Sequence, residues 1–157
     1  MDKDQLRRKY RKARISADVT SVDAKSLEIC RRVFGAVDWE AVNRICSYSP
    51  IDSLKEVNVT PLHDTVRYKF PDIKIEILSP AKNQAPPRIR FDLIIVPCLA
   101  FDKDNYRLGW GGGFYDKFLA GQPQALKIGV AYSGGLVSEG LPREPHDIPL
   151  DTVITEG

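Results

Sequence analysis

The sequence predicts an α/β fold, a single three-layer domain in which helices flank a mainly parallel sheet. Three observations lead to this prediction. Segments in which apolar and polar residues alternate, as in strands, are interspersed along the chain with segments of helical periodicity. Residues 91–97, FDLIIVP, form the unbroken apolar run that a strand buried on both faces requires. The 157 residues suit one domain and contain no linker-like segment, so residues 1–157 are expected to form one unit.

The first helix is expected to begin after Asp2, because Asp2 and Gln5 have the spacing of a capping box. Lys3 and Arg7 lie four residues apart, so their side chains project from neighbouring turns of one helix face. The inward face is predicted to hold Leu6, Tyr10 and Ala13. Residues 1–14 contain seven basic and two acidic side chains, whereas the whole chain has a net charge of only +2. This local positive charge predicts one anionic ligand or partner.

Two longer helices are expected before the middle of the chain. One covers residues 21–36, with an inward face of Leu27, Cys30, Val33 and Phe34. The other begins at Thr60 and Pro61, a capping residue followed by proline at the first helical position, and runs through residue 69. A short helix is expected at 114–119, and strands are expected at 44–49, 72–78, 91–97, 126–132 and 152–155. Ligands of parallel sheets bind at the carboxyl ends of strands, where the loop after Pro97 lies.

The composition favours a cytoplasmic protein. No stretch approaches the roughly 18 consecutive apolar residues of a membrane span. The N-terminus lacks the apolar core of a secretory signal. Three cysteines, Cys30, Cys46 and Cys98, have no paired or metal-binding spacing and lie in apolar runs. They are expected to be buried thiols in a reducing compartment.

The stretch from Arg107 to Asp116, RLGWGGGFYD, predicts an anion-binding loop. Glycine lets the backbone approach a ligand closely and turn several N–H groups toward it. Arg107 adds a forked positive charge suited to phosphate, and Asp116 is suited to Mg²⁺. The pattern is neither a dinucleotide-binding G-x-G-x-x-G nor a Walker A motif. By composition alone, a glycine-rich connector with its arginine in solvent also remains open.

The order of residues around this loop narrows the choice. Residues 92–119 resemble the signature region of the 5-formyltetrahydrofolate cyclo-ligase (methenyltetrahydrofolate synthetase) family. In that family an apolar strand is followed by Pro-Gly-x-x-Phe-Asp and then by Arg-x-Gly-x-Gly-x-Gly-Tyr-Tyr-Asp. Here Cys98 and Phe114 replace a glycine and the first tyrosine. Lys3-x-x-Leu-Arg7 resembles the family's N-terminal motif, and His146-Asp147-x-x-x-Asp151 resembles its closing motif.

The resemblance implies ATP-dependent cyclisation of 5-formyltetrahydrofolate to 5,10-methenyltetrahydrofolate, with release of ADP and phosphate. ATP and Mg²⁺ are therefore the expected cofactors, and a folate is the expected small-molecule substrate. The resemblance implies catalytic roles for Arg107 and Tyr115, and metal ligation by Asp116 and Asp151. Residues implied to contact the substrate are Glu56, Trp110, Phe114 and Tyr115. Residues implied to bind ATP are Lys3, Arg7, Arg107, Gly109, Trp110, Gly111, Gly112, Gly113, Phe114 and Tyr115.

One departure from the family leaves an alternative open. Family members usually carry a longer insertion where only residues 81–90 stand here. The alternative is therefore a family relative that uses ATP on a different small acceptor. A nucleic-acid-binding module is the third interpretation, and it is disfavoured because the positive charge is confined to one helix. We expect no nucleic-acid partner, no membrane partner and a monomer.

Overall fold

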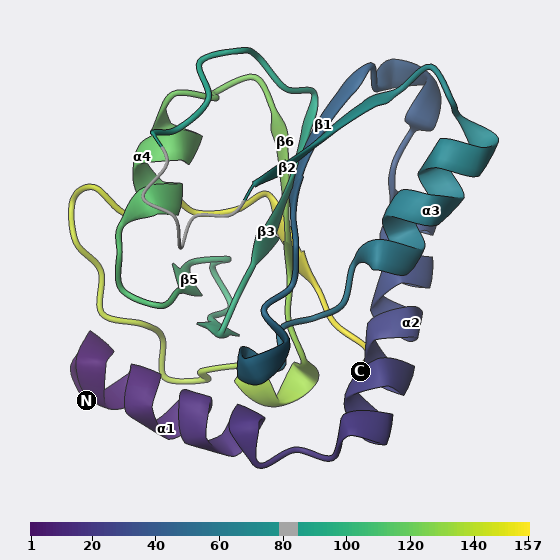
Figure 1. Ribbon diagram of the computed structural model, residues 1–157. Coiled ribbons are helices and arrows are strands. Elements are labelled where there is room, and N and C mark those ends of the chain that lie inside the picture. Colours follow the sequence, from purple (N-terminus) through teal and green to yellow (C-terminus); the bar gives the residue numbers. More distant parts are fainter. Residues whose placement is uncertain (79–84) are drawn as a thin grey trace.

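The computed structural model describes residues 1–78 and 85–157. Its centre is a five-stranded sheet of order β2-β1-β3-β6-β7 in which every neighbouring pair is parallel (Figure 1). This confirms the α/β prediction. Each strand lies inside a predicted range and is one or two residues shorter than that range. The bounds are β1 Arg44–Tyr48, β2 Lys74–Leu78, β3 Leu93–Pro97, β6 Leu126–Val130 and β7 Thr152–Ile154.

The central strand β3 is buried along its whole length, as its apolar run predicts. Leu93 and Ile95 pack into the core on one face of the sheet. Ile94 and Val96 pack into the core on the other face. Successive strand side chains point to opposite faces, so an unbroken apolar run is what a two-faced core demands.

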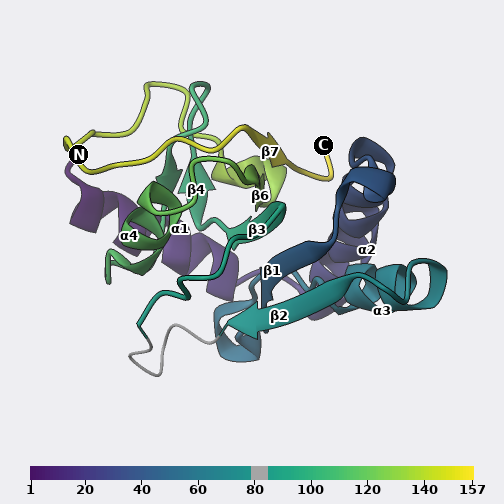
Figure 2. The same ribbon diagram turned by 90° about the horizontal axis from the view of Figure 1, so that it is seen from above.

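Helices α2, Val19–Ala36, and α3, Thr60–Lys69, cover one face of the sheet (Figure 2). The inward positions of α2 follow helical spacing and are Ser26, Ile29, Cys30 and Val33. The prediction for Leu27 was wrong, because its side chain is 58% exposed. Position 26 faces inward instead, and the Ser26 hydroxyl accepts a hydrogen bond from the Asn58 backbone N–H at 3.0 Å.

Helix α4, Phe114–Ala120, covers the opposite face, and α1, Lys3–Ile15, lies across the carboxyl ends of the strands (Figure 1). The predicted capping box of α1 is present, with Asp2 and Gln5 bonding each other's backbone N–H. Leu6 is buried as expected, whereas Ala13 is exposed and Arg14 takes the inward position. The Arg14 guanidinium is accommodated there because it donates to the backbone carbonyl groups of Cys98 and Leu99.

A small antiparallel hairpin was not predicted. Its strands, β4 Ala100–Phe101 and β5 Arg107–Leu108, have only two residues each, too few for a periodic pattern. Asp102 organises the turn, since its carboxylate accepts from the backbone N–H groups of Asp104, Tyr106 and Leu141. The hairpin matters because it fixes the starting point of the glycine loop at the carboxyl edge of the sheet.

Three short 3₁₀ turns complete the described elements: η1 Trp39–Ala41, η2 Asp52–Leu54 and η4 Ser133–Gly135. All three cysteines are buried free thiols, as predicted. Within the described ranges, none of the helices has the length and apolar character to span a membrane. The expected short connector at 81–90 falls partly on residues 79–84, which lie outside the described residues.

Candidate active site

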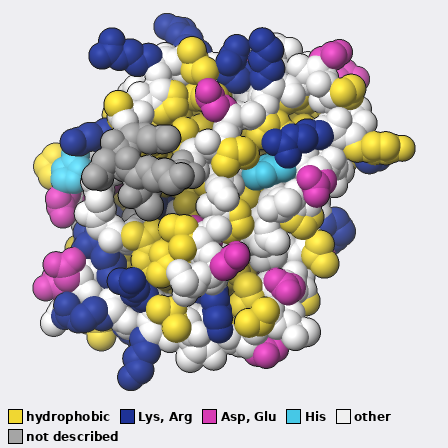
Figure 3. Space-filling model, viewed as in Figure 1, with side chains coloured by type: hydrophobic (Ala, Val, Ile, Leu, Met, Phe, Trp, Pro, Cys, Tyr) yellow, Lys and Arg dark blue, Asp and Glu magenta, His cyan; other side chains and the backbone are white. Residues whose placement is uncertain are grey.

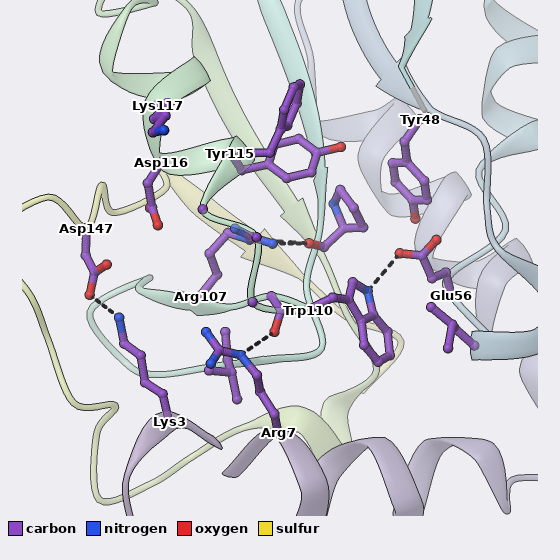
Figure 4. Close-up of a pocket in the computed structure, with 18 of the residues that line it drawn as sticks. Lys3, Arg7, Tyr48, Glu56, Arg107, Trp110, Tyr115, Asp116, Lys117 and Asp147 are labelled. Carbon is purple, nitrogen blue, oxygen red and sulfur yellow. Dashed lines mark hydrogen bonds and ion pairs between the residues drawn. The ribbon is translucent and has the colours of Figure 1, made fainter. Parts of the chain in front are cut away.

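A cavity of about 1160 Å³ opens at the carboxyl edge of the sheet, where the sequence predicts the ligand. Its walls come from six segments of the chain: the first half of α1, the end of β1 with the segment after it, Pro86 between β2 and β3, the end of β3, the glycine loop with α4, and residues 142–147. Figure 4 shows the charged side chains of these segments pointing toward one another. All predicted ATP-binding and substrate-binding residues line this cavity.

The glycine loop adopts backbone conformations that require glycine at two positions. Gly111 has a φ of 111° and Gly113 a φ of 68°, both in the region that side chains disfavour. At Gly109 a Cβ atom would come within 2.4 Å of an Arg107 guanidinium nitrogen, so a side chain there would displace that guanidinium. The loop therefore exposes backbone to the cavity and lies tightly against Arg107.

Arg107 is half-buried and held in place rather than free in solvent. Its guanidinium donates to the Pro97 carbonyl oxygen through Nη2 at 3.1 Å and through Nε at 3.3 Å. The same group stacks over the Tyr115 ring at 4.9 Å from the centroid. The alternative of a connector with a solvated arginine does not describe this geometry.

Helix α1 brings two more cations to the loop. Arg7 donates through Nε to the Gly109 carbonyl oxygen at 3.0 Å, and its Nη1 pairs with Asp4 at 2.8 Å. Lys3 pairs with Asp147 at 2.7 Å. Figure 3 shows Lys and Arg side chains gathered over α1, at the lower left of that view. The local positive charge seen in the sequence thus borders the cavity.

The carboxylates near the loop are not the pair that the sequence predicts. Asp116, His146 and Asp147 bring one potential ligand atom each to within 4.8 Å of one another. Asp151 is directed elsewhere, because its Oδ2 accepts from the Lys127 backbone N–H at 2.7 Å at the edge of the sheet. Residues 147 and 151 stand four apart in an irregular segment, not on one helix face, and so they diverge.

The donor set around Asp116 fits a hard divalent cation such as Mg²⁺. Carboxylate oxygens are the protein ligands that Mg²⁺ prefers, and Asp116 and Asp147 supply them. His146 is 63% exposed and is a weaker candidate ligand. Burial would raise the pKa of Asp147, but hydrogen bonds from Lys3 and from the Glu144 backbone N–H outweigh it and lower that pKa. Asp147 is therefore available as an anion.

Across the cavity stands a buried acid, Glu56, only 6% exposed. Its Oε1 accepts from the Ile51 backbone N–H at 2.8 Å, and its Oε2 accepts from the Trp110 indole N–H at 3.2 Å (Figure 4). Burial raises the pKa of the Glu56 carboxyl, and it outweighs these two hydrogen bonds and the charges of Arg14 and Arg107, which lower that pKa.

Two aromatic side chains at the start of α4 form the wall between these groups. Tyr115 is 7% exposed, and within the described part of the chain its hydroxyl group is buried without a hydrogen-bond partner. Burial raises the pKa of Tyr115, so the hydroxyl is a neutral donor. Phe114 packs edge-on against it, with ring centroids 5.3 Å apart. A ligand with an acceptor group at this wall would satisfy the unpaired hydroxyl.

Sequence reasoning missed Arg14. This residue is 8% exposed, and its Nη2 donates to the carbonyl oxygens of Cys98 at 2.7 Å and Leu99 at 3.3 Å. Its guanidinium also lies 5.1 Å from the Tyr132 ring centroid. Arg14 thereby fastens α1 to the end of β3. The available signal was its position seven residues after Arg7, which is two helical turns along the same face.

The fold and cavity together define an α/β protein with a cavity at the carboxyl edge of a parallel sheet, bordered by Lys3, Arg7 and Arg107. Residues 53–156 match the model of the 5-formyltetrahydrofolate cyclo-ligase family. The chain therefore belongs to the 5-formyltetrahydrofolate cyclo-ligase family. Membership makes it a ligase of folate one-carbon metabolism and implies that it uses ATP.

Individual relatives agree with the family match. A 5-formyltetrahydrofolate cyclo-ligase of Mycoplasma pneumoniae is 28% identical over an alignment of 171 positions, gaps included, which covers 99% of each chain. The Escherichia coli K12 enzyme of that name is 35% identical over 127 residues, covering 74% of this chain and 65% of its own.

Two solved structures share the fold. The 5,10-methenyltetrahydrofolate synthetase of M. pneumoniae superposes with a TM-score of 0.83 at 24% identity, over 100% of both chains. The synthetase of Aquifex aeolicus superposes with a TM-score of 0.79 at 28% identity, over 99% of this chain and 90% of that one. The arrangement of sheet and helices around the cavity is therefore the arrangement of methenyltetrahydrofolate synthetases.

Proposed function

We propose that this protein closes 5-formyltetrahydrofolate to 5,10-methenyltetrahydrofolate with ATP, releasing ADP and phosphate, in the cavity at the carboxyl edge of the sheet. The family match supports the cyclo-ligase activity. One observation supports the location: the glycine loop, the cations of α1 and the carboxylates of Asp116 and Asp147 converge on a single cavity. Because one chain supplies all of these groups, a monomer suffices for the reaction.

The phosphates of ATP belong on the loop side of the cavity. There the backbone of residues 109–113, the guanidinium groups of Arg7 and Arg107 and the ammonium group of Lys3 offer donors and positive charge. Asp116 and Asp147 would hold Mg²⁺, replacing the predicted pair of Asp116 and Asp151. When bound, the ion neutralises phosphate charge during transfer. Lys3 pairs with Asp147, and we therefore place its ammonium group between that carboxylate and the phosphates.

The formyl oxygen of the substrate is a poor leaving group, and phosphorylation of this oxygen makes it a good one. The γ-phosphoryl group passes to that oxygen and ADP leaves. The N10 nitrogen then attacks the activated carbon, and the carbon–oxygen bond breaks as phosphate departs with the proton that N10 loses. Arg107 stands at the loop to stabilise the transferring charge, and Tyr115 offers a neutral hydroxyl donor. The chain's task is positioning and charge neutralisation, without a covalent nucleophile.

The folate is placed on the other side, between Phe114, Trp110 and Glu56. Phe114 and Trp110 present flat apolar surface, and Glu56 presents the acceptor for ring N–H groups. The alternative, a different small acceptor, was motivated by the short connector at 81–90. The M. pneumoniae relative, a cyclo-ligase, aligns over 99% of both chains, so the short connector does not prevent alignment with a cyclo-ligase along almost the whole chain. That comparison favours the folate.

The direct test mixes the protein with ATP, Mg²⁺ and 5-formyltetrahydrofolate and follows the near-ultraviolet absorbance of the methenyl product. An ATP-dependent rise is expected, with one ADP formed for each product molecule. ATP binding without any rise in absorbance would favour the different acceptor. Asp116→Ala is expected to abolish the rise without loss of fold, whereas Asp64→Ala on the exposed face of α3 serves as the matched control.

A further inference from the structure

Trp110 joins the two sides of the cavity through a single hydrogen bond. Its backbone belongs to the glycine loop, between Gly109 and Gly111, and its indole reaches the opposite wall. There the indole N–H donates to Oε2 of Glu56 at 3.2 Å, and Figure 4 shows the ring lying between Arg7 and Glu56. The other carboxylate oxygen accepts from the Ile51 backbone N–H at 2.8 Å. Both oxygens of Glu56 are therefore oriented by donors.

The surroundings of Glu56 make this orientation consequential. A carboxylate that is 94% buried is costly unless hydrogen bonds and opposite charges compensate it. Arg14 from α1 and Arg107 from β5 supply positive charge. Tyr48 from β1 and Tyr115 from α4 also face it, and both hydroxyls are neutral because burial raises the pKa of each. Of the side chains in this set, Trp110 donates a hydrogen bond to the carboxylate.

The Trp110 ring is itself held from the α1 side. The guanidinium carbon of Arg11 lies 5.5 Å from its centroid and that of Arg14 lies 6.0 Å away. These cation–π contacts fix the ring over α1 and leave its N–H edge directed at Glu56. Three elements, α1, the glycine loop and the segment before α3, thus meet at one indole.

We propose that Trp110 is a positioning residue that acts through Glu56, holding its carboxyl group as an oriented acceptor for N–H groups of the folate substrate. This inference rests on the proposed function and adds to it. A residue of the phosphate-binding loop sets the acceptor on the substrate side. This role, exerted through Glu56, differs from the direct contacts with ATP and with the substrate that the family resemblance implies for Trp110.

Trp110→Phe removes the indole N–H that donates to Glu56 and keeps a smaller aromatic ring at the position. We expect the KM for 5-formyltetrahydrofolate to rise about tenfold, which corresponds to one hydrogen bond to a charged group. The KM for ATP should change less than about twofold, because the loop backbone is kept. Loss of a donor to an anion raises its pKa, so the acid limb of kcat/KM for the folate should move to higher pH.

A double-mutant cycle tests whether Trp110 acts through Glu56 or directly on the substrate. If it acts through Glu56, Trp110→Phe has a large effect in the wild-type background and almost none on top of Glu56→Gln. Additive effects of the two substitutions would overturn the proposal. Glu76→Gln, on the exposed edge strand β2, is the matched control and should leave the effect of Trp110→Phe unchanged.

Tryptophan emission gives a readout that needs no turnover. The chain has two tryptophans, and Trp39 is buried with its indole N–H on the Phe34 carbonyl oxygen at 2.9 Å. The difference between the wild type and Trp110→Phe therefore reports Trp110. We expect this emission to titrate with pH in the wild type and to lose that titration in Glu56→Gln. A Trp110 signal that ignores Glu56→Gln, or a wild-type acid limb in Trp110→Phe, would refute the positioning role. Absence of methenyl product would refute the proposed function, and the emission titration would still test the contact.

Discussion

The glycine-loop side of the cavity and the Glu56 side hold their charged groups in opposite ways. Arg107 and Arg7 are half-buried and donate to backbone carbonyl oxygens of Pro97 and Gly109, so their remaining N–H groups face the cavity. Glu56 is almost fully buried, and donors occupy both of its oxygens. The first arrangement suits a highly charged ligand that brings its own counter-charge. The second suits a neutral ring that must be oriented.

This difference teaches how the two sides should respond to substitution. The loop side depends on the sum of its positive charge and on the path of its backbone. Loss of a positive charge or of a loop glycine should therefore weaken the binding of ATP more than the binding of folate. The Glu56 side depends on one oriented acid, so loss of a side chain that contacts Glu56 should weaken the binding of folate alone. The following experiments probe this division, beginning with the largest expected effect.

Arg107→Ala should lower kcat by about a hundredfold to a thousandfold, because it removes a preorganised charge at the transferring phosphoryl group. Arg107→Lys should recover little of this loss, since an ammonium group cannot both grip the Pro97 carbonyl and stack on Tyr115. Steady-state rates of methenyl formation measure both. Arg31→Ala, with a side chain 71% exposed on α2, is the control. Wild-type rates in Arg107→Ala would show that the loop is not the phosphate site.

Asp147→Asn should raise the Mg²⁺ concentration for half-maximal rate by about tenfold, because it removes one carboxylate charge from the proposed pair. Asp151→Asn should leave this concentration unchanged and instead lower the unfolding midpoint, since Asp151 accepts from Lys127 in the sheet. Rates against Mg²⁺ at fixed ATP, together with Mn²⁺ binding by electron paramagnetic resonance, measure the metal effect. The opposite pattern would restore the pairing of Asp116 with Asp151.

Gly111→Ala should weaken ATP binding by about tenfold, because a side chain at a φ of 111° costs about 1–3 kcal/mol of backbone strain. Gly112→Ala is a close control, because its φ is not positive and a Cβ atom there meets nothing within 4 Å. Calorimetric titration with ATP compares the two variants. The KM for folate should stay near wild type in both. Equal losses of ATP affinity would mean that backbone conformation is not what the loop contributes.

The smallest effect on turnover is expected at His63, which the structure buries against Ser47. His63 Nε2 and Ser47 Oγ lie 2.7 Å apart, and burial, helped by Arg67, lowers the pKa of His63 to about 4. The folded protein keeps this imidazole neutral while the unfolded chain takes up a proton below pH about 6.5. The stability from His63 is therefore complete above pH 6.5 and is lost as pH falls toward 4, by at most about 3 kcal/mol.

Urea unfolding at pH 7, 6 and 5 measures this loss. His63→Gln keeps a polar side chain for Ser47 and removes the titration, so its stability should fall less steeply over the same range. An identical pH dependence in both proteins would place the acid-sensitive group elsewhere. Turnover near neutral pH should be little changed in His63→Gln, because His63 lies outside the cavity lining.

Much of the fold was predictable because its signals are local. The run at β3, the capping box of α1 and the proline in the first turn of α3 each act through neighbouring residues. The predicted capping role of Thr60 was wrong, because Thr60 is the first residue of α3 and Val59 holds the cap position without a side-chain hydrogen bond. The errors arose where a choice depends on what lies opposite. Leu27 is as apolar as its neighbours, yet the packing of α2 on the sheet turns Ser26 inward. The β4–β5 hairpin escaped prediction because long-range partners, not its two-residue strands, define it.

The glycine loop is the part of the candidate site whose residues could be identified from the sequence. Arg107, the glycines, Tyr115 and Asp116 are contiguous, so their order alone indicates an anion site and the family. Tertiary structure decided what joins them. It selected Asp147 over Asp151 as the neighbour of Asp116, turned Arg14 of α1 toward the carbonyl groups after β3, and set the Trp110 indole against Glu56. These contacts link residues as many as 85 positions apart, and such pairings depend on how the strand ends and helices pack, which no local pattern encodes.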